Sequence, residues 1–271
     1  MNAIEVNHMY KKIGDFQLRD LSFNVEQGTV MGFIGQNGAG KTTTIKCILN
    51  SLKITTGNIS VFGKNHAEHE LDIKENIGVV FDELHVPDSL TAIDLDKFYG
   101  NVYKRWDRSY FFNLLERLDV SKYTKVKDLS RGMKMKLSLA LALSHHPKLL
   151  ILDEPTSQLD PIAASEFLQA LYKINQELGI TIIIAEHRLE EVYQMVNKVV
   201  LMDKSKIYLC DAPRKIGEKL SNDDVSLKMS YALPTPIQIY NKTGKIGECP
   251  LTVNEGKQYI INNFNNKINS C

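Results

Sequence analysis

A glycine-rich loop in this 271-residue chain has the residue types and spacing needed to bind phosphate groups. The loop fills the pattern G-x-x-x-x-G-K-[ST] without a mismatch, through Gly35, Gln36, Asn37, Gly38, Ala39, Gly40, Lys41, Thr42 and Thr43. Its glycines allow successive backbone N–H groups to point at one phosphate, because no Cβ stands in the way. Lys41 can reach the β- and γ-phosphates, and the Thr42 hydroxyl can hold Mg²⁺. We therefore predict that the chain binds a nucleoside triphosphate with Mg²⁺.

The segments on either side of the loop support this prediction. An apolar run at residues 30–34 precedes the loop, and a helix-like stretch at residues 43–49 follows it. This strand–loop–helix order places a helix N-terminus, with its partial positive charge, at the phosphates. The alternative interpretation is a chance glycine-rich turn, which would not need these flanking elements.

A second candidate site lies at the end of another apolar run, residues 149–152, which is followed by Asp153 and Glu154. If this run is a buried parallel strand, its carboxyl end lies at the sheet edge where ligands bind. Asp153 can then reach the Mg²⁺ opposite Thr42, and Glu154 can polarise an attacking water. The alternative interpretation is a strand that ends in two solvated acids.

The order of the predicted elements indicates an α/β fold. Alternating residues near the N-terminus predict antiparallel β structure, and apolar runs predict strands at 59–62, 77–81, 149–152 and 180–185. Helical periodicity dominates residues 89–146 and returns at 163–178. Strands that alternate with helices predict a mainly parallel sheet with helices on both faces.

The character of the chain changes from about residue 223 onward. Residues 231–236 contain two prolines and read as a linker, and the segment beyond them is β-like and then rich in asparagine. We expect residues 223–271 to be an accessory segment that forms a small β unit or is partly disordered.

Composition excludes several classes of function. The 33 basic and 32 acidic residues leave a net charge of +1, so we expect no nucleic-acid partner. The 4 cysteines show no metal-ligand or redox spacing, which is typical of free thiols in a reducing cytosol. The N-terminus lacks the pattern of a signal peptide, and the longest apolar runs are too short to cross a bilayer.

A third motif lies between the two candidate sites, at Leu129, Ser130, Arg131, Gly132 and Met133. The order of phosphate loop, Leu-Ser-x-Gly, Asp153-Glu154, Ser-Gln-Leu-Asp at 157–160 and a later His187 resembles the ATP-binding subunits of ATP-binding cassette (ABC) transporters. This resemblance covers residues 1–222. It implies a P-loop NTPase (RecA-like) core with an antiparallel β subdomain and an α-helical subdomain at about 85–146.

The resemblance also implies a mechanism in which two cassettes enclose two ATP molecules head to tail. Ser130 and Gly132 would contact the ATP held by the partner, and Asp160 would couple the two sites. Glu154 and His187 would be catalytic, with His187 at the γ-phosphate. The implied partners are a second ABC cassette, in a homodimer or a heterodimer, and transmembrane permease subunits. The chain would then lie in the cytoplasm, on the inner face of the membrane.

Several residues depart from the usual pattern of the family. Arg131 and Met133 stand where Gly and Gln are usual. Asp82 stands where a Gln normally contacts Mg²⁺, and we expect this carboxylate to bind the ion directly or through water. Ile13 aligns with the aromatic residue that stacks on adenine, although Tyr10 and Phe16 lie nearby.

Asp82, the Leu-Ser-Arg-Gly-Met-Lys run and the aromatic segment 103–107 resemble a branch of bacterial ABC-2-type exporters. That branch includes exporters of antimicrobial peptides and of the phenol-soluble modulins of staphylococci. The leading hypothesis is an ATPase that drives export of a peptide or antibiotic-like cargo. The alternative is a soluble or regulatory ABC ATPase that acts as an ATP-gated binding module without transport.

Overall fold

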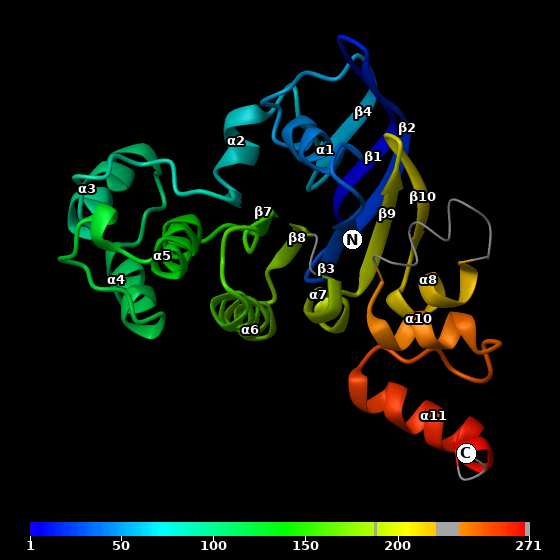
Figure 1. Cartoon of the computed structure of the whole chain (residues 1–271). Coiled ribbons are helices and arrows are strands. Elements are labelled where there is room, and N and C mark those ends of the chain that lie inside the picture. Colours follow the sequence, from blue (N-terminus) through cyan, green and yellow to red (C-terminus); the bar gives the residue numbers. More distant parts are fainter. Residues whose placement is uncertain (187–188, 221–232, 269–271) are drawn as a thin grey trace.

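The computed structural model describes residues 1–186, 189–220 and 233–268, and two β-sheets form its centre (Figure 1). The larger sheet has 6 strands in the order β10-β9-β3-β8-β7-β6, and the smaller has 4 in the order β2-β1-β4-β5. Strands β9, β3, β8, β7 and β6 run parallel, whereas β10 and the whole smaller sheet pair antiparallel. The strands are β1 (Asn2–Ile13), β2 (Phe16–Glu26), β3 (Val30–Ile34), β4 (Thr56–Val61), β5 (Lys64–Asn65), β6 (Ile77–Val80), β7 (Leu149–Asp153), β8 (Thr181–Ala185), β9 (Lys198–Asp203) and β10 (Lys206–Asp211). The predicted mainly parallel sheet is confirmed.

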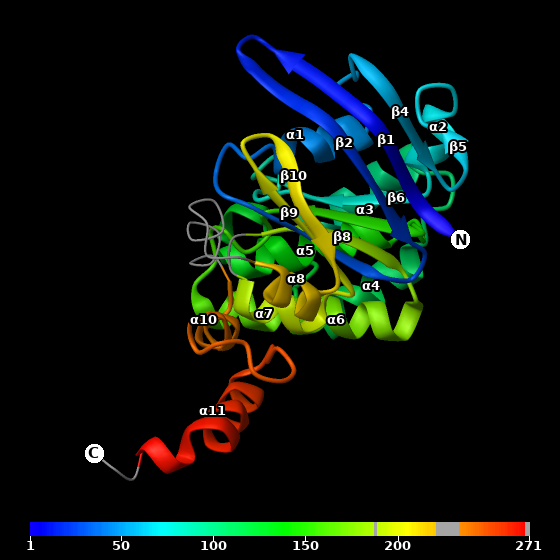
Figure 2. The ribbon, with the colours of Figure 1, turned by 90° about the vertical axis from the view of Figure 1, so that its right-hand side faces the viewer.

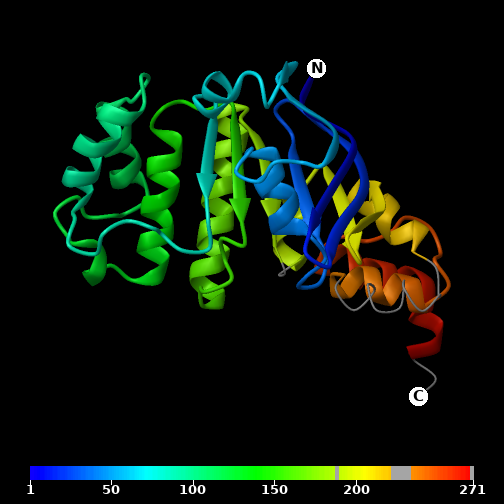
Figure 3. The same cartoon turned by 90° about the horizontal axis from the view of Figure 1, so that it is seen from above.

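Helices cover both faces of the larger sheet. They are α1 (Lys41–Ile48), α2 (Glu70–Lys74), α3 (Ala92–Val102), α4 (Arg108–Arg117), the 3₁₀ turn η1 (Val126–Asp128), α5 (Arg131–Leu143), α6 (Pro161–Leu178), α7 (Leu189–Met195), α8 (Pro213–Lys219), α10 (Thr235–Lys242) and α11 (Val253–Ile268). Figure 2 shows α1 between the two sheets and α6 and α7 on the opposite face of the larger sheet. Figure 3 shows α3 and α4 beyond α5, at the β6 side of the molecule. No helix of the described chain combines the length and apolar character that a membrane span requires.

Strand β7 explains how one sheet supports two cores. Its side chains alternate between faces, as in any strand. Leu149 and Ile151 belong to the core shared with α1 and the smaller sheet, whereas Leu150 and Leu152 belong to the core shared with α5 and α6. All four are fully buried. A strand buried on both faces reads as a continuous apolar run, which is the pattern seen in the sequence.

In the helical part that contains α3, α4 and α5, a buried carboxyl group joins α3 to the start of α4. Asp96 of α3 is 3% exposed, accepts a hydrogen bond of 3.0 Å from the Trp106 indole and pairs with Arg108 at 3.0 Å. Capping residues begin all three helices: Thr91 for α3, Asp107 for α4 and Ser130 for α5. The helical character predicted for residues 89–146 is therefore confirmed.

The prediction of a small β unit in the C-terminal segment is wrong for the described residues. They form the helices α10 and α11 instead. Ile237 and Tyr240 are three residues apart and buried, which is the spacing of one helix face. Tyr259 buries α11 against the same core, so packing outweighs the weak helix propensity of the asparagines. The predicted linker ends inside α10, because Thr235 begins that helix; residues 231 and 232 lie outside the described residues.

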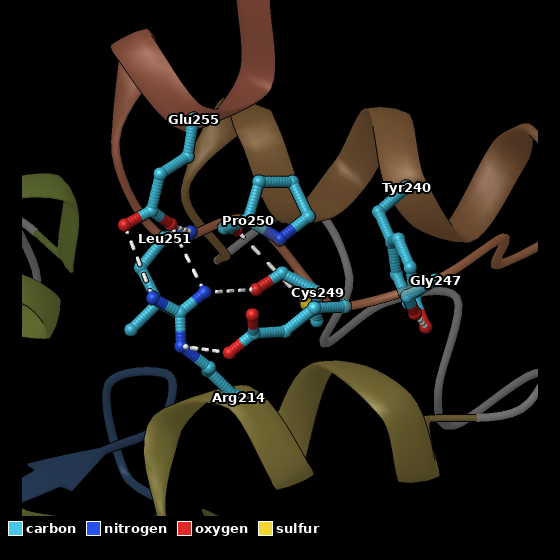
Figure 4. Close-up of polar contacts among 8 residues, drawn as sticks. Arg214, Tyr240, Gly247, Cys249, Pro250, Leu251 and Glu255 are labelled. Atoms are coloured by element: carbon cyan, nitrogen blue, oxygen red, sulfur yellow. Dashed lines mark hydrogen bonds and ion pairs between the residues drawn. The ribbon is translucent and has the colours of Figure 1, made fainter. Parts of the chain in front are cut away.

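One arginine ties the C-terminal helices together (Figure 4). Arg214 of α8 donates two hydrogen bonds of 3.0 Å to the Glu255 carboxylate at the start of α11, and a third of 2.6 Å to the Cys249 carbonyl. This contact with Arg214 holds the pKa of Glu255 below its usual range. Tyr240 of α10 donates to the Gly247 carbonyl at 3.0 Å. The loop between α10 and α11 is therefore bound to both α8 and α10.

Candidate nucleotide-binding site

The glycine-rich loop connects the end of β3 to the start of α1, as the sequence predicts. Two of its glycines are required by close packing. A Cβ on Gly35 would lie 2.5 Å from the Met202 carbonyl oxygen, and a Cβ on Gly40 would lie 2.5 Å from Leu18 Cδ2. Gly40 also has a φ of +106°, which side-chain-bearing residues rarely adopt. The close backbone approach at Gly35 and the backbone conformation of Gly40 therefore both favour glycine in the loop that leads into α1.

Lys41 is held inside this loop. Its side chain is buried, its ammonium donates to the Gly35 carbonyl at 2.9 Å, and it lies 3.5 Å from the Glu154 carboxylate. Burial lowers the pKa of Lys41, while the charge of Glu154 opposes that shift. A phosphate entering the loop would meet a cation that is already positioned by the backbone.

Thr42 and Asp153 form a pair of oxygen donors beside Lys41. The Thr42 hydroxyl donates to Asp153 Oδ1 at 3.1 Å, which joins the start of α1 to the end of β7. Asp153 is buried, and burial raises its pKa, with the nearby carboxylates of Glu154 and Asp82 adding to this effect. A buried carboxylate and a hydroxyl are the hard oxygen ligands that Mg²⁺ prefers, so these residues fit the predicted metal.

Glu154 has an unusual backbone conformation for a residue at the end of a strand. Its φ is +53°, in the left-handed region, and its N–H donates to the Ala185 carbonyl at 2.9 Å. Its side chain is 26% exposed, so the carboxylate is accessible from solvent while it lies next to Lys41. Strained backbone that the surrounding structure enforces is concentrated at functional sites. The geometry is compatible with the predicted role of Glu154 as a general base.

Glu186 belongs to this site although the sequence analysis did not identify it. It follows β8, is 1% exposed, and accepts a hydrogen bond of 2.7 Å from the Thr156 N–H. Its carboxylate therefore fixes the loop that follows Glu154. The signal in the sequence was an acid directly after a buried strand. The adjacent His187, the predicted contact to the γ-phosphate, lies outside the described residues.

The Leu-Ser-x-Gly motif occupies the N-terminus of α5. Ser130 caps that helix by accepting a hydrogen bond of 3.2 Å from the Met133 N–H, and it is exposed. A Cβ on Gly132 would lie 3.4 Å from Ala163 of α6, whereas Leu129 is buried beneath the motif. In Figures 1 and 3, strands of the larger sheet separate α5 from α1. The fold thus keeps this motif apart from the phosphate loop of the same chain.

Asp82 lies shortly after β6, and Asp160 lies at the end of the loop that follows β7. Both residues are exposed. Asp160 is the N-cap of α6 and accepts hydrogen bonds of 3.0 Å from the Ile162 and Ala163 N–H groups. Asp82 follows β6, and its charge contributes to the raised pKa of Asp153. The structure therefore places Asp82 close enough to Asp153 to affect its pKa, and Asp160 on the exposed surface at the start of α6.

Two residues, at the end of β1 and at the start of β2, are candidates for the contact with adenine. Ile13, at the end of β1, is 45% exposed. Phe16, at the start of β2, lies beside the phosphate loop, since its ring would be 3.5 Å from a Cβ on Gly40. Phe16 is thus an aromatic candidate for stacking on the base, next to the residue that alignment favoured.

Comparisons with known proteins agree on one family. A family model described as ABC transporter matches residues 18–157. The bacitracin transport ATP-binding protein BcrA of Bacillus licheniformis is 38% identical over 189 residues, which cover 69% of this chain and 62% of BcrA. The matched part therefore spans less than two thirds of that relative.

Two solved structures have the same fold. The structure of cbiO1 from Clostridium perfringens, described as part of the ABC transporter complex cbiONQ, superposes with a TM-score of 0.72 at 28% identity, covering 88% of this chain and 98% of cbiO1. The dimeric ATP-binding cassette MJ0796, bound to ADP and Pi, superposes with a TM-score of 0.69 at 21% identity and covers 78% of this chain and 99% of that one. At 21% identity, the similarity to MJ0796 shows a shared fold only.

Proposed function

Because the chain is an ATP-binding cassette of the ABC transporter family, whose cassettes are ATPases, we propose that it drives export through separate membrane subunits. Two cassettes would close around two ATP molecules, and hydrolysis would reopen them. Conversion of ATP to ADP and phosphate would thus alternate the access of the membrane subunits to the two sides of the bilayer.

The observation that carries this proposal is the meeting of four side chains from two elements. Lys41 and Thr42 begin α1, Asp153 ends β7 and Glu154 directly follows it, with contacts of 3.5 Å between Lys41 and Glu154 and 3.1 Å between Thr42 and Asp153. Lys41 would bind the β- and γ-phosphates, and Glu154 would take a proton from the attacking water. Thr42 and Asp153 would hold Mg²⁺, with Asp82 beside them, and the bound ion would neutralise charge on the phosphates.

Dimerisation is supported by the position of the remaining motif residues. Ser130 caps α5 and is exposed, so the N-terminus of α5 is available to the γ-phosphate of an ATP on another cassette. Asp160 is exposed as well, at the start of α6. The dimeric state described for MJ0796, which shares the fold, also supports this arrangement. The second cassette would be a copy of this chain or a different one.

Contact with a membrane subunit is supported by exposed apolar side chains in the segment that runs from the end of β6 to the end of α3. Phe81 is 36% exposed, and Phe98 and Val102 of α3 are 60% and 54% exposed. Apolar residues exposed on neighbouring segments are typical of protein interfaces. The partner would hold the chain on the cytoplasmic face of the membrane. A peptide or antibiotic-like cargo is supported by the likeness to BcrA, whose name assigns it to bacitracin transport.

The test is the ATPase rate of Glu154→Gln in the purified chain. We expect the variant to bind a fluorescent ATP analogue as the parent does and to lose about 10²–10⁴-fold in kcat, because only the proton acceptor is removed. Glu166→Gln is the matched control, since Glu166 lies on the exposed side of α6 and pairs with Lys136 at 3.1 Å. Hydrolysis by Glu154→Gln at the parental rate would remove the basis of the proposal.

A further inference from the structure

Three separate segments of the chain meet at Gln158, in the loop between β7 and α6. The Gln158 side-chain amide donates a hydrogen bond of 2.8 Å to the Glu83 carboxylate. The Gln158 backbone carbonyl accepts a hydrogen bond of 3.4 Å from the Arg131 guanidinium. Contacts from two distant segments therefore converge on one residue of the loop that follows Glu154.

Each of these segments carries a residue of the proposed site. Glu83 directly follows Asp82, and Arg131 directly follows Ser130. Gln158 itself lies four residues after Glu154 and two before Asp160. The contacts thus connect the metal side of the site, the Leu-Ser-x-Gly motif and the loop that carries the general base.

The Glu83 end of this connection is attached to the helical part of the chain. The segment between β6 and α3 is bound to η1, through hydrogen bonds of 2.8 Å from Val126 N–H to the Leu90 carbonyl and 3.1 Å from Lys127 N–H to the Asp88 carbonyl. Arg131 is the first residue of α5. Glu83 therefore lies where the chain leaves the sheet for the helical part, and Arg131 lies at the start of α5 inside that part. Bonds from both to Gln158 restrict the orientation of the helical part.

We propose that Gln158 is a positioning residue that orients the helical part, and with it Ser130, relative to Asp160 and Glu154. This inference rests on the proposed function, because the orientation matters only if two cassettes must close on each other. It also gives a role to Arg131, which stands where the family usually has glycine and reaches the Gln158 carbonyl. Loss of the contact would hinder closure of the dimer without changing how one chain binds ATP.

The test exchanges the donor and the acceptor. Gln158→Glu places two carboxylates face to face and removes the donated hydrogen bond. Glu83→Gln keeps a hydrogen bond, because an amide oxygen can accept from Gln158. In the double variant Glu83→Gln with Gln158→Glu, the bond returns in the opposite direction. We expect Gln158→Glu to lower kcat about threefold to tenfold with an unchanged KM for ATP, and the double variant to return to near the parental rate.

Gln169→Glu is the matched control for the added charge, because Gln169 is an exposed residue of α6 whose side chain donates a hydrogen bond of 3.2 Å to Ser165 of the same helix. ATP-dependent dimerisation, measured by size exclusion in the Glu154→Gln background, should fall in parallel with kcat. The inference is overturned if Gln158→Glu keeps the parental rate, or if the double variant is as impaired as Gln158→Glu. A Glu154→Gln variant that still hydrolyses ATP would instead overturn the proposed function, whatever the Gln158 variants do.

Discussion

The buried imidazole of His145 predicts a loss of stability in mild acid. His145 follows α5, is 1% exposed and stacks on Tyr103 with 4.1 Å between ring centroids. Its Nε2 lies 3.1 Å from the Ile77 carbonyl oxygen, while its Nδ1 is buried without a hydrogen-bond partner among the residues that the structure describes. Protonation would create a buried cation with one unpaired donor. Burial accordingly lowers the pKa of His145 to about 4.

The direction of the effect follows from proton binding. In the unfolded chain a histidine has a pKa of about 6.5, so between about pH 6.5 and 4 the unfolded state binds more protons than the folded state. Stability therefore falls as the pH falls through this window. Relative to pH 8, His145 lowers the free energy of unfolding by about 2 kcal/mol at pH 5, and this loss approaches about 3 kcal/mol below pH 4. Against a typical total of roughly 5–15 kcal/mol, this loss is measurable.

Urea unfolding of the parent and of His145→Gln at pH 8 and pH 5 isolates this contribution. Carboxylates titrate in the parent and in His145→Gln alike. The quantity to compare is therefore the loss of unfolding free energy from pH 8 to pH 5 in each protein. We expect the parent to lose about 2 kcal/mol more than His145→Gln between the two pH values. His85→Gln, at an exposed position, should behave as the parent does. Equal losses in the parent and in His145→Gln would show that the buried imidazole does not control the acid response.

The phosphate loop and the thiols give two further predictions. Gly40→Ala should weaken binding of a fluorescent ATP analogue at least about tenfold, because the backbone strain of about 1–3 kcal/mol adds to the clash with Leu18. Gly38→Ala, with a φ of +81° and no atom within 4 Å of its Cβ, should lose less, and equal losses would exclude the steric explanation. Cys47 and Cys249 should resist iodoacetamide at pH 8 in the folded protein, since burial raises their pKa to about 11 and about 12. Peptide mapping with and without urea tests this, and equal alkylation in both conditions would contradict it.

The local parts of the site could be predicted because their chemistry is local. A phosphate loop needs glycines at given spacings, and its strand and helix are its immediate neighbours in sequence. The acids Asp153 and Glu154 follow an apolar run directly, so the strand that presents them is also visible. Parallel strands bring such ends to one edge, which is why Thr42 and Asp153, 111 residues apart, were expected to meet.

The parts that could not be predicted depend on distant partners. The C-terminal segment contains many asparagines and reads as weakly structured, yet Tyr240 and Tyr259 bury it against the core as helices. Phe16 lies next to the phosphate loop only because β2 passes Gly40. Nothing in the residues near Gln158 indicates that its amide reaches Glu83, since the two are 75 residues apart.

The residues alone therefore defined which groups can hold a nucleotide and the strands that carry them, because glycine spacing and apolar runs act within a few residues. Tertiary packing decided which carboxylates are buried, which glycines have no room for a Cβ, and where the helical part lies relative to the sheet. Those properties come from atoms that are distant in sequence, as the contacts of Asp153 with Thr42 and of Glu83 with Gln158 show. The burial of a side chain and the orientation of the helical part each depend on many such contacts, which form only when the chain folds.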